Sequence, residues 1–237
     1  MMTAAATAVS RGETGQLPVG FYTWLSAGNL RATLVDYAKR FPDLDIRFVH
    51  NSRAQILAAI RSRKVDVAIV TGPPRDPNGS GETMPLWSER VVAALPASHP
   101  LASQQVVSWF DLKDETFLLP RDDLGEDFEL LLLARLASPG HRPNIVRHVA
   151  GIELITGLVG AGFGVALICD AYIGANHAGL SYREIQDSVS PARIGYSVSP
   201  ARIGYTARWH SENGNPALWR FIKILQERYP PLPDDKN

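Results

Sequence analysis

Apolar residues between positions 17 and 72 recur with two different periods. The largely apolar runs at 17–21 and 65–70 and the alternation of polar and apolar residues at 43–49 are typical of strands, and apolar residues at helical spacing lie between them. This stretch therefore predicts strand, helix, strand, helix, strand. Since strands joined by helices need crossover connections, we expect a parallel sheet whose carboxyl edge is available for binding.

Capping residues and prolines mark the ends of these two helices. Ser26 opens the first, whose apolar positions include Leu30 and Leu34, and Pro42 stops it. Ser52 and Gln55 are spaced as a capping box at the start of the second. Both predicted helix starts lie at the same edge of the sheet.

The rest of the chain continues the alternation of strands and helices. The pattern predicts a strand at 90–95, a short helix at 109–112, a strand at 116–120, a helix at 127–136, a strand at 144–150, a helix at 152–159, a strand at 165–169 and a helix at 215–228. The glycines at 160–164 end a helix and precede a strand. A dinucleotide-binding fingerprint needs the reverse order, which argues against a nucleotide site.

One nine-residue segment occurs twice in tandem. Residues 188–196 are repeated without change at 197–205. A sheet has room for one copy of the strand-like Ala-Arg-Ile-Gly-Tyr. We expect the second copy to occupy the strand and the first to form a surface extension, which costs little loop-closure free energy.

Composition narrows the class of protein. The 237 residues are 45% hydrophobic, enough for two modest cores, and 24 basic residues balance 24 acidic ones. This balance gives no positive field for nucleic-acid backbones, and the basic cluster at 61–64 is explained by a helix end. A single cysteine, no convincing signal sequence and no apolar run long enough to span a membrane favour the cytoplasm.

No catalytic or metal-binding motif is apparent. The six histidines form no HExxH pair, no G-x-S-x-G elbow occurs, and Cys169 lies in an apolar strand. We therefore expect no enzymatic activity, no metal and no cofactor.

Five segments in their order and spacing carry a family resemblance. They are 17–20, 41–46, 64–69, 95–102 and 157–167. The chain resembles the effector-binding domain of LysR-type bacterial transcription regulators. This resemblance implies an α/β, two-lobed, type 2 periplasmic-binding-protein-like fold in which each lobe has a mostly parallel sheet flanked by helices.

The resemblance also sets the expected domain limits. Lobe I comprises 15–94 and 201–229, lobe II comprises 95–187, and 188–200 form an extension at the crossover between lobes; 1–14 and 230–237 are a linker remnant and a tail. The family's winged helix-turn-helix is not seen in this sequence, so DNA is expected as a partner only through such a module.

The resemblance implies a small effector bound between the lobes. The positions that match are Ser26, Ala27, Asn51, Ser52, Leu119, Pro120 and Arg121. Thr71 and Gly72, which follow the third predicted strand, and Gly151 and Ile152, which start the helix before the glycines at 160–164, are expected to face the same gap. The start of a helix offers free backbone N–H groups and a partial positive charge, so we expect the ligand to carry a carboxylate or another anionic group.

Each candidate also has a structural explanation. Ser26 and Ser52 could simply cap their helices. Arg53 and Arg121 could pair with a carboxylate or be solvated. Tyr22 and Trp24 could stack on an effector or pack over the core.

The family also implies an antiparallel homodimer, or a tetramer for full-length members. Residues 29–41 would face 127–136 of the partner, through Leu30, Leu34, Leu130, Leu131 and Leu133; the run at 130–133 is apolar on more than one helical face. The expected function is an effector-sensing regulatory domain, and the alternative is a stand-alone solute-binding protein with the same fold.

Overall fold

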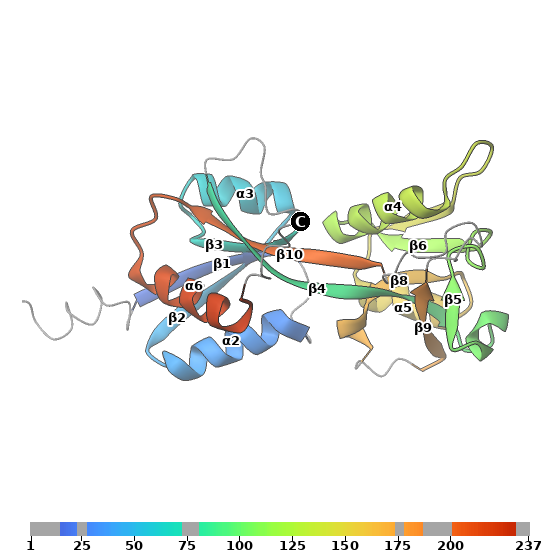
Figure 1. The fold of residues 1–237 in the computed structure, drawn as a ribbon, viewed down its shortest axis with the longest axis horizontal. Helices are drawn as coiled ribbons and strands as arrows, with labels where there is room; N and C mark the ends of the chain where they lie inside the picture. The colour runs from blue at the N-terminus through green and yellow to red at the C-terminus, as the bar shows by residue number, and fades with distance from the viewer. Residues whose placement is uncertain (1–14, 23–27, 73–80, 174–177, 187–200, 231–237) are drawn as a thin grey trace, which may run out of the picture. The chain divides into compact units, whose positions relative to one another are not determined.

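The computed structural model describes residues 15–22, 28–72, 81–173, 178–186 and 201–230. The chain forms two compact units. Unit 1 comprises residues 1–88 and 204–237, and unit 2 comprises 89–203. The chain passes between the units twice, once within strand β4 and once within strand β10 (Figure 1).

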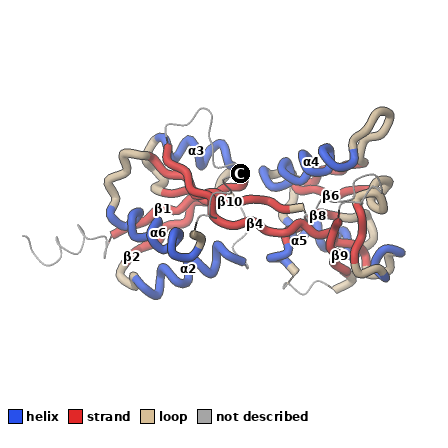
Figure 2. Tube along the Cα trace, in the orientation of Figure 1, coloured by secondary structure: helices blue, strands red, loops and turns tan. Residues whose placement is uncertain are grey.

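Unit 1 is built on a four-stranded stretch of sheet in the order β2-β1-β3-β10. Its elements are β1 (Gly15–Phe21), α2 (Gly28–Arg40), β2 (Leu44–His50), α3 (Arg53–Arg61), β3 (Val67–Thr71), the first part of β4 (Gly81–Pro96), β10 (Arg202–His210) and α6 (Pro216–Arg228). Helix α3 covers one face of the sheet, and α2 and α6 cover the other (Figures 1 and 2).

The parallel arrangement predicted for the first three strands is confirmed. Strand β1 pairs in parallel with β2 from Gly15↔Leu44 onward and with β3 from Val19↔Val67 onward. Strand β10 then runs antiparallel to β3, with Tyr205 opposite Thr71. All five residues of β3 are buried, as expected for a strand covered on both faces.

Unit 2 contains the remaining elements. They are most of β4, the 3₁₀ turn Pro100–Ser103, β5 (Val106–Ser108), β6 (Thr116–Pro120), α4 (Asp123–Leu136), β7 (Asn144–His148), α5 (Ile152–Gly160), β8 (Ala166–Cys169), the 3₁₀ turn Asp170–Tyr172 and β9 (Leu180–Gln186). The pairs β6–β7 and β5–β9 are parallel, whereas β4 pairs antiparallel with β8 and β9.

Two local expectations in unit 2 need correction. The short helix predicted at 109–112 is a series of turns, in which Leu112 N donates to Trp109 O at 3.2 Å and Lys113 N to Phe110 O at 3.3 Å. Helix α4 begins at Asp123, four residues before its predicted start, because the Asp122 carboxylate caps it and accepts from Gly125 N at 2.9 Å.

The second copy of the repeat supplies the start of β10. This strand begins at Arg202 and continues past Tyr205 to His210. The choice of the second copy for the strand is therefore confirmed. The first copy, 188–196, lies outside the described residues.

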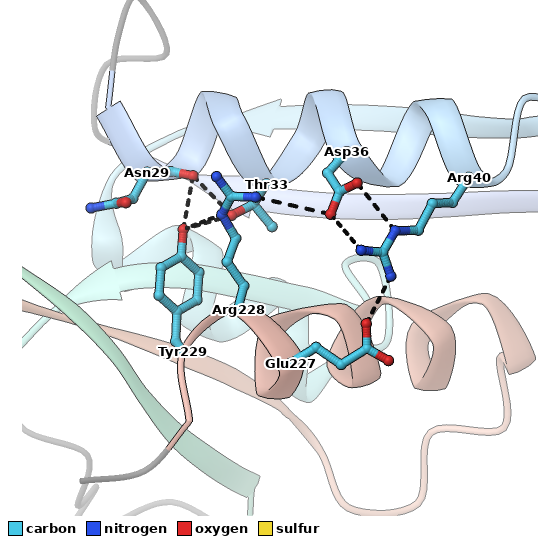
Figure 3. A network of polar contacts seen from close by, with 7 residues as sticks. All are labelled: Asn29, Thr33, Asp36, Arg40, Glu227, Arg228 and Tyr229. Carbon is cyan, nitrogen blue, oxygen red and sulfur yellow. Dashed lines mark hydrogen bonds and ion pairs between the residues drawn. The ribbon is translucent and has the colours of Figure 1, made fainter.

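Helices α2 and α6 are joined by polar contacts along their length (Figure 3). The Tyr229 hydroxyl donates to Asn29 O at 3.1 Å and lies 2.8 Å from Thr33 Oγ1. Arg40 bridges Asp36 at 3.0 Å and Glu227 at 2.7 Å. These ion pairs are exposed and add little to stability, so the tyrosine contacts and the apolar core contribute more to the packing.

Tyr37 is the largest fully buried side chain in this interface. Its hydroxyl donates to Ala217 O at 3.0 Å, and its ring meets Phe221 edge-on at 5.1 Å. Burial raises the pKa of Tyr37 well above its ordinary value, an effect that the nearby Arg220 opposes. The folded protein therefore favours the neutral phenol.

We predict that Tyr37→Phe lowers the free energy of unfolding by about 1 kcal/mol at pH 7, because one buried hydrogen bond is lost. Since the folded pKa exceeds the unfolded one, the contribution of the phenol is complete below about pH 10 and is lost as the pH rises further. Urea unfolding at pH 7 and above pH 10 should show a smaller alkaline loss in the variant. An equal alkaline loss in both proteins would contradict this assignment.

Candidate functional site

The carboxyl edge of the unit 1 sheet gathers most of the candidates from this unit. Strands β1, β2 and β3 are parallel, so Phe21, His50 and Thr71 end at the same edge. The residues directly after these strands include Tyr22, Asn51, Ser52 and Gly72.

Tyr22, Arg53 and Thr71 form one connected cluster at this edge. The Tyr22 hydroxyl contacts Thr71 Oγ1 and accepts from Thr71 N at 2.9 Å. Arg53 Nη2 donates to Thr71 Oγ1 at 3.2 Å, and the guanidinium carbon lies 5.0 Å from the centre of the Tyr22 ring. Tyr22 and Thr71 are buried, so both fix the guanidinium in place.

Gly72 is held by the strand that returns to this unit. Gly72 N donates to Gly204 O at 3.1 Å, and Thr206 Oγ1 donates to Gly72 O at 2.9 Å. Gly72 has φ +110°, a backbone conformation that favours glycine. Thr206 was not among the predicted site residues. The one sequence signal for it is its position directly after the second copy of the repeat, in the strand predicted there.

Ser52 performs the capping role considered for it. Its Oγ accepts from Gln55 N at 3.3 Å and donates to Gln55 Oε1 at 2.9 Å, while Asn51 Oδ1 accepts from Ser52 N at 3.1 Å. Both Asn51 and Ser52 are exposed. Capping therefore accounts for the serine, and a ligand could still reach it.

The unit 2 candidates lie at the carboxyl edge of the β6–β7 pair. Pro120 is opposite His148, and Arg121 N donates to His148 O at 2.7 Å. Leu119, Pro120 and Ile152 are buried and pack in this unit, whereas Arg121 is exposed. Gly151 precedes α5 and has no side chain with which to cap it.

The start of α4 is acidic, a property that sequence reasoning did not weigh. Asp122 caps the helix, and Asp123 and Glu126 lie in its first turn. Carboxylates at a helix start complement the helix dipole and reduce its attraction for an anion. Of the two helix starts at this edge, that of α5, where Glu153 lies in the first turn, carries fewer carboxylates.

Some predicted residues cannot be placed. Trp24, Ser26 and Ala27 lie outside the described residues. Of the predicted interface leucines, Leu30 and Leu34 are buried within unit 1, Leu131 and Leu133 are partly buried, and Leu130 is 66% exposed. Leu130 therefore presents the largest surface of the five.

The described part of the chain contains no cluster of three or more histidine, cysteine, aspartate or glutamate side chains arranged to hold a metal ion. Cys169 is fully buried in β8. Among the described helices, none combines the length and the apolar character required to span a membrane.

The family model described as the LysR substrate binding domain matches residues 10–230. The chain belongs to this family. Among its relatives are the HTH-type transcriptional regulator AlsR of Bacillus subtilis, 26% identical over 92% of this chain and 68% of AlsR, and the Hca operon transcriptional activator HcaR of Escherichia coli, 28% identical over 91% of this chain and 69% of HcaR.

Solved structures of LysR-type proteins have the same fold. The BenM effector-binding domain with its effector benzoate superposes with a TM-score of 0.72, at 21% identity over 90% of each chain. The effector-binding domain of QuiR in complex with shikimate gives a TM-score of 0.71 at 20% identity, over 90% of this chain and 96% of QuiR. The predicted α/β fold of the type 2 periplasmic-binding-protein kind is thereby confirmed.

We predict that Tyr22→Phe lowers the free energy of unfolding by about 1–3 kcal/mol, because it removes the buried acceptor of Thr71 N. Tyr182→Phe is the matched control, since the buried Tyr182 hydroxyl has no hydrogen-bond partner within the described residues. Urea unfolding at pH 7 should separate the two variants. Equal effects of both substitutions would show that the Tyr22 hydroxyl does not support this edge.

Proposed function

We propose that this chain is the effector-sensing domain of a LysR-type transcription regulator and that its effector is a small carboxylate. The observation that carries the proposal is the Arg53 guanidinium, held by Thr71 and the Tyr22 ring at the carboxyl edge of the unit 1 sheet. A planar guanidinium can bind a carboxylate through two parallel hydrogen bonds. Its fixed position reduces the entropy lost on binding.

The chemistry of two relatives supports a carboxylate. BenM was solved with benzoate and QuiR with shikimate, and both molecules carry one carboxylate on a six-membered ring. In this chain Arg53 would bind the carboxylate, and Asn51, Ser52 and Gly72 would contact the rest of the effector. Ser26 and Ala27, at the start of the preceding helix, belong to the same proposed set.

Residues of unit 2 complete the proposed contact set. Arg121 is the exposed cation at the carboxyl edge of β6, and the start of α5 at Gly151 and Ile152 offers backbone N–H groups. Leu119 and Pro120 would contribute apolar surface. In the sequence Arg121 directly precedes Asp122, the capping residue of α4.

The signal would pass to DNA through other parts of a full-length regulator. Effector binding that favours one conformation shifts the population of the domain, and a homodimer would carry this shift to attached winged helix-turn-helix modules in the cytoplasm. The named relatives are transcriptional regulators, so they favour this function over that of a stand-alone solute-binding protein.

We predict that small ring carboxylates such as benzoate or shikimate raise the thermal midpoint of the protein and that Arg53→Gln weakens their binding about tenfold or more. The loss corresponds to one charge-assisted hydrogen bond. Calorimetric titration gives the affinity. The uncharged carboxamide analogues should bind more weakly to the natural protein.

Arg47→Gln is the matched control, because Arg47 is an exposed arginine of the same unit whose partner is Asp45. Ser52→Ala, in the same titration, separates the two roles of the serine. Capping alone costs about 1 kcal/mol of stability and leaves the affinity unchanged. An Arg53→Gln protein that binds the carboxylate as tightly as the natural one would refute the proposed site.

We predict that the protein is a dimer at micromolar concentration and that Leu130→Glu makes it monomeric, because a charge would be buried in an apolar interface. Light scattering measures the mass, for which one chain is 25.9 kDa. Phe163→Glu is the control, since Phe163 and Leu130 are 67% and 66% exposed and Phe163 lies outside the predicted interface. A monomeric natural protein, or equal dimerisation of all three, would contradict this arrangement.

A further inference from the structure

A cavity in unit 2 has no role in the proposed effector site. It measures about 450 Å³, and its lining includes Trp109, Phe110, Lys113, Arg135, Ser138 and His141. Cavities of about 300–1,000 Å³ are typical of small-molecule sites. The first three residues come from the turns after β5, and the other three come from the end of α4 and the turn beyond it.

The lining combines positive charge with aromatic surface. Lys113 and Arg135 are cationic, and no lining residue is acidic. The Lys113 ammonium lies 4.2 Å from the centre of the Phe110 ring, and Phe110 is 65% exposed. Asp114, outside the lining, is 3.9 Å from the ammonium but is itself mostly solvated. The cation–π contact therefore keeps a positive charge beside an exposed aromatic side chain.

Two polar side-chain atoms in this lining have unused hydrogen-bonding capacity. Trp109 is 4% exposed, and within the described residues neither its Nε1 nor the buried Nε2 of His141 has a hydrogen-bond partner. Buried polar atoms without partners are uncommon in native proteins, because each costs free energy. The wall that Trp109 and His141 form is therefore not stabilised by hydrogen bonds from these two atoms within the described residues.

The turn after α4 gives the cavity a preformed wall. Ser138 and His141 exchange two backbone hydrogen bonds, of 3.0 and 3.1 Å, across Pro139 and Gly140. Gly140 has φ +81°, as expected for the third position of a type II turn with proline before it. This turn is the loop beyond the carboxyl end of α4 in Figure 2. Little ordering of this segment would be needed on binding.

The cavity is also distant from the effector residues of the same unit. Those residues lie at the start of α4, and Arg135 lies in its last turn. Twelve residues separate Asp123 from Arg135, which corresponds to about 18 Å along a helix axis. A ligand of ordinary size in the cavity would not reach Arg121.

We propose that this cavity is a second ligand site, specific to unit 2, that binds an aromatic carboxylate. The carboxylate lies against Lys113, and the aromatic part packs against the exposed side chain of Phe110, with Trp109 beside it in the lining. The apolar part of the ligand accounts for affinity, and the charge determines selectivity over neutral aromatics.

The test uses 2-naphthoate as the probe and the tryptophans as reporters. The chain has five tryptophans, so labelling with 5-fluorotryptophan gives up to five ¹⁹F resonances, and Trp109→Phe assigns the one from the cavity. Titration with 2-naphthoate should shift the Trp109 resonance in a saturable manner. Naphthalene-2-carboxamide, which has the same shape and no charge, should bind about tenfold more weakly.

Variants distinguish this cavity from the effector site. Lys113→Gln should weaken the Trp109 response about tenfold, and Lys39→Gln, on α2 of unit 1, should leave it unchanged. Arg53→Gln should also leave it unchanged, so a failure of the proposed effector site would not remove this response. A Trp109 resonance that does not move at millimolar 2-naphthoate, or equal binding of the carboxamide, would overturn the proposal.

Discussion

The parallel pairing of β1 with β2 and β3 is the constraint on which the rest of unit 1 depends. It requires α3 to cross close over the sheet, and Gly20 in β1 makes this approach possible. A Cβ at Gly20 would lie 2.8 Å from Ile56 Cγ2 and 3.0 Å from Val65 Cγ1. Any side chain there would displace α3 and, with it, Ser52 and Arg53 at its start.

The same pairing accounts for the chemistry at the sheet edge. Three strand ends meet there, so residues far apart in sequence become neighbours, as Tyr22, Arg53 and Thr71 do. Fold alone does not establish function, and LysR-type domains with one architecture are solved with different effectors. If this chain is an effector-binding domain, as we propose, its selectivity would come from its own edge residues.

Much of unit 1 could be predicted because its apolar residues recur clearly at strand and helix spacing. The runs at 17–21 and 65–70 and the capping serine at 52 all identified real elements. Strands β5 and β9 were missed because one has only three residues and the other is partly polar and only half-buried along most of its length. The turns at 109–112 were predicted as a short helix because three of their four residues are apolar, and a segment this short cannot show a helical period.

The site was harder to predict than the fold because its contacts are not local. The role of Thr71 depends on Tyr22, 49 residues away, and Gly72 depends on Thr206, 134 residues away. The capping aspartate of α4 could be read from sequence, but it lies before the apolar run that suggested the helix. Spacing arguments describe one element at a time, and these residues meet only through the sheet.

The tandem repeat has a consequence for how β10 selects its register. Both copies offer the same nine residues, so only the residues beyond each copy can distinguish the strand. After the second copy come Thr206 to Trp209, with Ala207 fully buried opposite Ile69 and Trp209 opposite Val67. A slip by nine positions would bring Pro200 opposite Val67, where a proline cannot donate a backbone hydrogen bond. The first half of the strand thus fits either copy equally well, and the second half excludes the slipped register. Loss of either copy would leave the same residues in the sheet.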